Sequence, residues 1–270
     1  MKTENPWLHR FAILVALVAL VAIILGAVVT SLERPIAATL AAEIPAAHSF
    51  ESWHQIIGAL AAVLVIGLVI GIRNQAGVIA LAAGALDAAL GFSSGASSSV
   101  LHALFAQIFF GNIVAFAVNT STAWRRGPSP IDDTWKPSLR SLAVAVPVVI
   151  LLQTTLGASY RYHTLGVIWH ILNAMIVLLL NLIVAIFLIR QFPDHPTLKP
   201  AALALAVITG IQVFLGFTTF MMLILFPETS LAVIITSVIH VATGSLTFAA
   251  GLALSTLIRY NIRTPAAAPA

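Results

Sequence analysis

Long apolar runs recur along the chain from residue 11 to residue 258, separated by short segments that carry charges, proline or glycine. A membrane-spanning helix needs roughly 20 apolar residues, because lipid offers no partners for backbone polar groups. Runs of this length exclude a transmembrane barrel, whose strands alternate apolar and polar residues over short segments. The sequence therefore predicts an all-α polytopic membrane protein, in agreement with a composition that is 60% hydrophobic and 8% charged.

Charged or Pro/Gly-rich breaks divide these runs into expected spans. The spans are residues 11–31, 51–72, 76–92, 99–123, 139–159, 165–189, 200–222 and 231–258. The first is too long for a signal-peptide core and is expected to be retained. The third is the weakest and contains Asp87. Six-span and seven-span plans are therefore alternatives, and Asp87 is expected at a helix interface or cavity without an assignable partner.

The basic residues indicate the orientation of the spans. With eight spans and both termini cytoplasmic, only Arg34 and Arg161 of the 13 Lys and Arg residues fall outside. Removing the third span would place the cluster from Arg125 to Arg140 outside. We therefore expect eight transmembrane helices with cytoplasmic termini, in the inner (plasma) membrane. The basic residues form no single patch, so nucleic acid is not an expected partner despite the net charge of +4.

A duplicated plan divides the chain into a half at 1–125, a cytoplasmic linker at 126–138 and a half at 139–270, each half being an expected four-helix bundle. Short motifs occur in the same order in both halves. In the first half, Leu25-Gly26-Ala27 precedes Trp53-His54, and Leu90-Gly91-Phe92 precedes His102. In the second half, Leu156-Gly157-Ala158 precedes Trp169-His170, and Leu215-Gly216-Phe217 precedes His240.

Four of the eight histidines fall within spans, in the outer leaflet: His54, His102, His170 and His240. The chain has no cysteine, which removes thiolate haem ligation, iron–sulfur clusters and cysteine zinc sites. Two imidazoles on different helices of a bundle can supply both axial ligands of a haem iron. The pattern therefore predicts one haem-iron site in each half. For any single histidine, a hydrogen bond that bridges helices is an equal alternative.

Charged residues near the external face differ between the halves. Glu51 lies three residues before His54 on the same helix face, whereas Val167 has this place in the second half. This asymmetry predicts an acid/base group beside a substrate in the first half, with an exposed interfacial carboxylate as the alternative. Arg34 and Arg161 are candidate partners for haem propionates, or interfacial anchors. A di-iron site would need a second Glu-x-x-His, which the chain lacks.

Four stretches together resemble the haem A synthase family over nearly the whole chain. They are Glu51-Ser52-Trp53-His54, Leu101-His102-Ala103-Leu104-Phe105-Ala106-Gln107, Arg161-Tyr162-His163-Thr164-Leu165-Gly166 with Trp169-His170, and His240-Val241-Ala242. The resemblance implies a haem-dependent membrane oxidoreductase that converts the C8 methyl of haem O to the formyl group of haem A by successive hydroxylations. It implies that Glu51, His54 and His102 serve the substrate haem, and that His170 and His240 hold haem b.

The same resemblance implies oxygen, an external electron donor and a haem O synthase as partners, and it leaves a homo-oligomer open. Two features depart from the family: the first external loop lacks a cysteine pair, and the fifth-to-sixth connection reads Arg161-Tyr162-His163. The main alternative function is a di-haem b-type electron-transfer or oxidase-assembly subunit. A transporter with inverted repeats is disfavoured, because both halves are expected to start inside.

Overall fold

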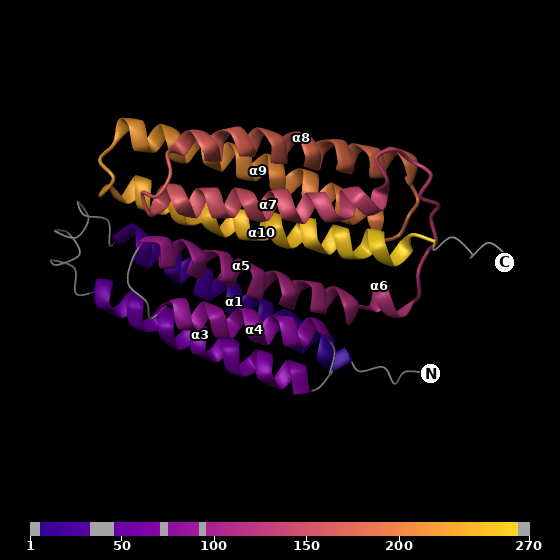
Figure 1. Ribbon diagram of the computed structural model, residues 1–270, viewed down its shortest axis with the longest axis horizontal. Coiled ribbons are helices and arrows are strands. Elements are labelled where there is room, and N and C mark those ends of the chain that lie inside the picture. Colours follow the sequence, from indigo (N-terminus) through magenta and orange to yellow (C-terminus); the bar gives the residue numbers. More distant parts are fainter. Residues whose placement is uncertain (1–5, 33–45, 71–74, 92–95, 264–270) are drawn as a thin grey trace.

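A computed structural model describes residues 6–32, 46–70, 75–91 and 96–263 (Figure 1). These residues are almost entirely helical, and a single isolated bridge pairs Ile131 with Ile262. The helices are α1 (Pro6–Leu32), α3 (Ala46–Ile70), α4 (Gln75–Gly91), α5 (Ala96–Asn119), α6 (Thr122–Arg125), α7 (Leu139–Arg161), α8 (Val167–Gln191), α9 (Leu198–Leu225) and α10 (Leu231–Asn261).

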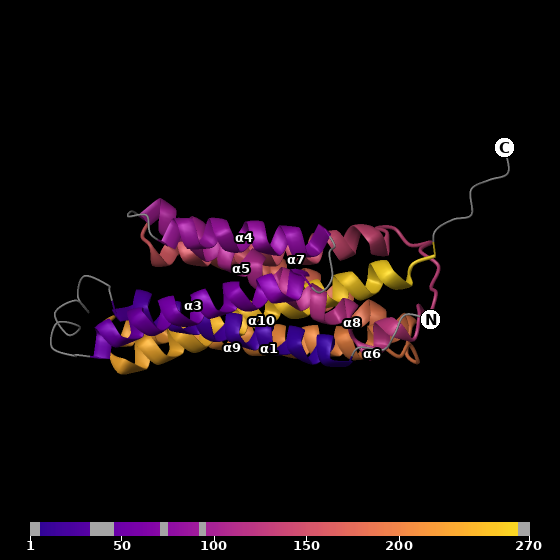
Figure 2. The same ribbon diagram turned by 90° about the horizontal axis from the view of Figure 1, so that it is seen from below.

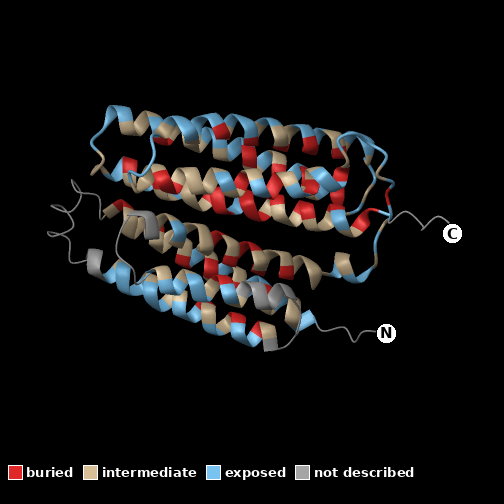
Figure 3. Ribbon diagram, in the orientation of Figure 1, coloured by how far each residue is buried: buried red, intermediate tan, exposed pale blue. Residues whose placement is uncertain are grey.

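The long helices have the length and composition of membrane spans. Among the described residues, seven are long and apolar enough to cross a bilayer, while α4, with 17 residues, is shorter. Many exposed residues lie on these helices (Figure 3), and they include Leu179 at 63% and Phe214 at 68% exposure. Such large apolar side chains are stable on an outer surface that faces lipid. The chain is therefore a helical multi-pass membrane protein.

The helices are arranged as two groups of four (Figure 1). In the first group α1 and α4 each pack against both α3 and α5, so α3 and α5 lie at opposite corners. In the second group α7 and α9 each pack against both α8 and α10, which places α8 and α10 at opposite corners. The groups meet where α10 packs against α1 and α5, and α5 against α7. In that interface Gln107 Nε2 donates a hydrogen bond of 2.8 Å to Ser245 Oγ.

Helix boundaries follow local capping more closely than the expected spans did. α3 begins at Ala46, earlier than the expected residue 51, and α5 ends at Asn119 rather than at 123. The chain then forms the separate turn α6, because the Ser121 hydroxyl accepts a hydrogen bond of 3.2 Å from the Trp124 amide. α7 begins at the expected residue 139, where the Asp133 carboxylate accepts a 2.8 Å hydrogen bond from the Leu139 amide.

All long helices run along the long axis, which leaves connections at two ends of the molecule (Figures 1 and 2). α1 begins and α10 ends at the same end, on the right in Figure 1. The linker is fastened there, because the Ile131 amide donates to the Asn261 carbonyl at 2.8 Å and the Arg263 amide donates to the Ile131 carbonyl at 3.0 Å. Every described Lys and Arg except Arg161 belongs to this end: Arg10, Arg125, Arg126, Lys136, Arg140, Arg190, Lys199, Arg259 and Arg263.

Candidate functional site

His54 and His102 meet inside the first group of helices. Their ring centroids are 5.9 Å apart and the ring planes are inclined by 88°. His54 lies on α3 and His102 on α5, the two helices at opposite corners of the group. The two imidazoles therefore approach one another across the centre of the group, near the end where α1 finishes.

His170 and His240 form the same arrangement in the second group. Their ring centroids are 6.2 Å apart and the planes are inclined by 86°. Here too the side chains come from helices at opposite corners, α8 and α10. The structure thus brings together the four intramembrane histidines in the pairs that the repeated motifs suggested.

Each imidazole lies against a glycine on the neighbouring helix. A Cβ at Gly26 would lie 2.9 Å from His54 Cε1, one at Gly91 3.3 Å from His102 Cε1, one at Gly157 2.9 Å from His170 Cε1, and one at Gly216 3.0 Å from His240 Cε1. Any larger residue would push the ring away. These are the glycines of the repeated sequence motifs, and sequence reasoning treated them only as markers of duplication. Their position before each histidine was the available signal.

Backbone carbonyls hold the Nδ1 atoms of these rings. His54 Nδ1 lies 2.9 Å from the Ala22 carbonyl, His102 Nδ1 2.9 Å from the Asp87 carbonyl, and His170 Nδ1 3.2 Å from the Gln153 carbonyl. Each of these carbonyls belongs to the residue four positions before the adjacent glycine. Its second lone pair therefore accepts the helical hydrogen bond from the amide of that glycine. The corresponding carbonyl for His240 is that of Gln212. Among the described residues, however, the buried Nδ1 of His240 has no partner in hydrogen-bond geometry.

This hydrogen bond fixes the roles of the two ring nitrogens. A carbonyl only accepts, so in His54 and His102 Nδ1 carries the proton and Nε2 carries the lone pair. In the second group Gln153 Nε2 lies 3.0 Å from His170 Nδ1 and 3.3 Å from His170 Nε2, and Gln212 Nε2 is 3.5 Å from His240 Nε2. In His54 and His102 the Nε2 lone pair is the one that a metal would take. Metal-binding histidines commonly donate their other N–H to a carbonyl in this way.

The spacing of each pair fits a metal bound between two imidazoles. Two metal–nitrogen bonds of about 2 Å, plus roughly 1 Å from each nitrogen to its ring centroid, place the centroids about 6 Å apart. The measured separations are 5.9 and 6.2 Å. Within the described ranges no group of three or more His, Asp or Glu side chains assembles for a metal ion. Two nitrogens suffice for the axial positions of a haem iron, whose other ligands come from the porphyrin.

The polar surroundings of the two pairs differ. In the second group Gln153 Nε2 donates to the His170 carbonyl at 3.0 Å, and Asn173 Nδ2 donates to Gln153 Oε1 at 2.8 Å. In the first group the residues at the positions of Gln153 and Gln212 are Ala22 and Asp87. The Asp87 carboxylate oxygen Oδ1 lies 2.9 Å from His102 Nδ1. Asp87, to which the sequence assigned no partner, is therefore a neighbour of a candidate ligand.

Glu51 lies on the exposed side of α3, close to its start. Its carboxylate accepts a hydrogen bond of 3.4 Å from Gln55 Nε2, one turn further along the same helix. The structure thus places Glu51 at the same end of the molecule as the histidine pairs, on the helix that carries His54. Whether it acts on a substrate there stays a prediction.

Arg161 connects the two groups of helices at the histidine end. Its Nη2 donates to the Ala27 carbonyl and to the Ser31 hydroxyl of α1, both at 3.0 Å. A cation is favourable at this place, because the carbonyl end of α1 carries partial negative charge. The adjacent Tyr162 hydroxyl lies 3.1 Å from the Thr30 hydroxyl. The second predicted propionate partner, Arg34, lies outside the described residues.

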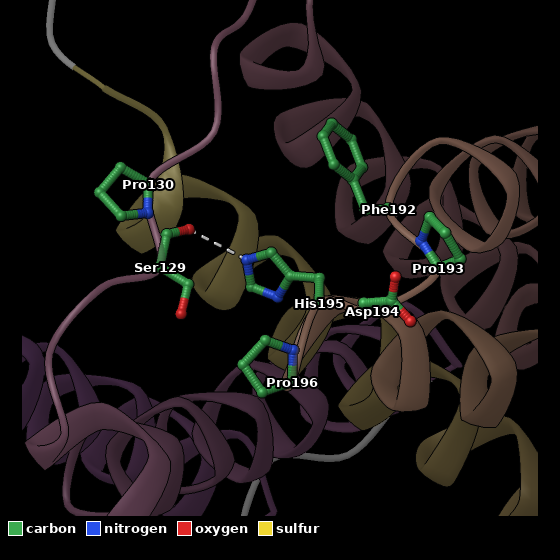
Figure 4. A pocket seen from close by; sticks show the side chains of 7 residues that line it. All are labelled: Ser129, Pro130, Phe192, Pro193, Asp194, His195 and Pro196. Carbon is green, nitrogen blue, oxygen red and sulfur yellow. Dashed lines mark hydrogen bonds between the residues drawn. The ribbon is translucent and has the colours of Figure 1, made fainter.

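His195 lies at the opposite end, in an open hollow of about 410 Å³ formed by the linker and the connection between α8 and α9 (Figure 4). Its Nε2 donates to the Ser129 carbonyl at 3.0 Å, and its Nδ1 accepts a hydrogen bond of 3.1 Å from the Leu198 amide. Both ring nitrogens thus serve to fasten the linker to the start of α9. This histidine has a structural role.

Comparison with protein-family models and with curated proteins found no match to the chain. The functional argument therefore depends on the geometry of the two histidine pairs, on the residues around them and on the motifs in the sequence.

Proposed function

We propose that the chain is an oxidoreductase of the haem A synthase type, with eight spans, both termini cytoplasmic, and one haem site in each half. The observation that carries this proposal is the repeated histidine pair, with centroid separations of 5.9 and 6.2 Å across the centres of the two helix groups. In three of the rings a backbone carbonyl of the neighbouring helix lies against Nδ1, the arrangement that metal-binding histidines commonly have.

The eight-span plan, in the inner (plasma) membrane, includes α4 as a short span. α4 packs against α3 and α5 and completes the first group, in the position that α9 has in the second. The contact between Asp87 of α4 and His102 of α5 lies at the end of the molecule that carries the histidine pairs. The concentration of Lys and Arg at the other end supports a cytoplasmic location for that end.

In the proposed activity the second half holds haem b between His170 and His240, and the first half receives haem O between His54 and His102. Bound haem supplies the redox chemistry that the side chains of this chain lack. The imidazoles would position the macrocycle, and backbone carbonyls lie against Nδ1 of His54, His102 and His170. Glu51 is the carboxylate on the helix of His54 and is proposed to hold or move a proton beside the substrate. Oxygen and an external donor supply oxidant and electrons.

The decisive experiment expresses the full chain in a host that makes haem O but no haem A, followed by extraction and mass analysis of the haems. We expect haem A with the natural chain, and haem b but no haem A with Glu51→Gln. Glu228→Gln is the matched control, because it removes a carboxylate from the connection between α9 and α10 at the same end, and it should still yield haem A. Haem b without any haem A in the natural chain would contradict the synthase proposal.

One observation favours a second candidate, a di-haem b-type electron carrier. The two histidine pairs have nearly the same geometry, and Glu51 is exposed and hydrogen-bonded to Gln55. An electron carrier would bind two haems and exchange electrons with a partner, and Glu51→Gln would leave that exchange unchanged. The extraction experiment distinguishes the two functions, since only the synthase changes the chemical identity of the haem.

A further inference from the structure

Asp87 contacts His102 through two of its atoms. The backbone carbonyl oxygen of Asp87 accepts a hydrogen bond of 2.9 Å from His102 Nδ1, and the buried carboxylate oxygen Oδ1, which is outside hydrogen-bond geometry, also lies 2.9 Å from Nδ1. The side chains are 25% exposed for His102 and 21% exposed for Asp87. The contact is therefore largely shielded from water, where a negative charge acts more strongly on its neighbour.

This carboxylate distinguishes His102 from the other three histidines. The residue four before the adjacent glycine is Ala22 for His54, Gln153 for His170 and Gln212 for His240. None of these side chains carries a charge. Equivalent positions in the fold thus carry a methyl group, a carboxylate or a carboxamide, and for His54, His102 and His170 the carbonyl of that residue lies against Nδ1.

A negative charge close to the N–H of a metal-bound imidazole makes that imidazole a stronger electron donor, and a stronger donor favours the more positively charged, oxidised metal. The negative charge itself acts in the same direction. Both effects lower the reduction potential of a haem bound through His102. An amide at that place would not produce either effect to the same degree.

We propose that Asp87 is a positioning residue that strengthens His102 as an iron ligand and gives the haem of the first half a lower reduction potential than the haem of the second half. The inference rests on the proposed function, because it requires haem in both halves. Its consequence is that an electron on the molecule resides preferentially on the second-half haem at equilibrium.

The test is a spectroelectrochemical titration of the purified, haem-loaded full chain, with His170→Ala used to assign the first-half potential. Asp87→Asn should keep both haems and raise the first-half potential. A change on the order of tenfold in the preference for oxidised over reduced iron corresponds to about 59 mV for one electron. Asp87→Glu, which keeps the charge, should retain most of the low potential. Asp132→Asn, which removes a carboxylate at the opposite end of the molecule, should give no shift.

The outcomes separate this inference from the proposed function. A natural chain without haem in its first half would contradict the proposed function. Two bound haems with no shift in Asp87→Asn would overturn the role of Asp87 alone. If Asp87→Asn does not fold, the natural chain decides: a first-half potential below that of the second half supports the inference, and an equal or higher one overturns it.

Discussion

Gly157 lies so close to the ring of His170 that a Cβ on this residue would come within 2.9 Å of Cε1. Gly157→Ala should therefore displace the imidazole and lower the haem affinity of the second half by about tenfold or more, as expected when a metal ligand is misoriented. The measurement is the haem-to-protein ratio of the purified variant. Gly210→Ala is the matched control, because no atom lies within 4 Å of a Cβ there, and full haem content is expected. Equal haem content in both variants would contradict the role of the glycine.

Replacement of His170 or His240 by alanine should remove one of the two expected haems and its bis-histidine absorption, because each pair shares a single iron. The measurement is the reduced-minus-oxidised spectrum together with haem extraction. His163→Asn is the control, since His163 is exposed in the connection after α7 and has a φ of 57° that asparagine tolerates. An unchanged spectrum in His170→Ala would exclude this residue as a ligand.

Arg161→Ala should destabilise the protein by about 1.5–3 kcal/mol, the range for hydrogen bonds that involve a charged group. The loss comes from the contacts to Ala27 and Ser31, which join α7 to α1. In thermal unfolding in detergent, each kcal/mol of lost stability lowers the midpoint temperature by roughly 2–4 °C. Arg125→Ala, at the opposite end and exposed, should leave the midpoint unchanged. If Arg161 also holds a propionate, the haem content of the variant falls as well.

The absence of cysteine from the chain makes it suitable for accessibility labelling. Thr134→Cys lies in the linker and Thr164→Cys in the connection between α7 and α8, and both positions are exposed. With eight spans and a cytoplasmic N-terminus, a membrane-impermeant maleimide added to intact cells should label position 164 and not position 134. The reverse pattern would mean that α4 does not cross the membrane or that the N-terminus lies outside, and would contradict the proposed topology in either case.

The pairing of the histidines could be predicted from the sequence, because duplication fixes which helices correspond and the apolar runs fix the depth of each histidine. The contact between Asp87 and His102 could not, since it depends on the rotation of α4 about its axis and on the register between α4 and α5. A periodic apolar pattern defines rotation poorly when a helix is apolar on nearly every side, as α4 is. The start of α3 at Ala46 was missed for a related reason: it lies in a segment without strong apolar character.

The glycines show a similar limit of sequence reasoning. Small residues are common in membrane helices, so a glycine alone does not indicate a ligand-positioning role. The role of Gly26 or Gly216 follows only when the imidazole of the neighbouring helix is seen against it. The fourfold recurrence of a glycine ahead of a membrane histidine was the informative pattern.

In this arrangement the orientation of an imidazole and the electrical character of its site depend on different atoms of one residue. The orientation of an imidazole depends on the carbonyl of the residue four before the glycine, which any amino acid supplies. The electrical character of the same site depends on the side chain of that residue: Ala22, Asp87, Gln153 or Gln212. Point substitutions there can change the electronic properties of one iron site while its geometry stays in place, so the two halves of a duplicated protein can acquire different chemistry without a change of fold.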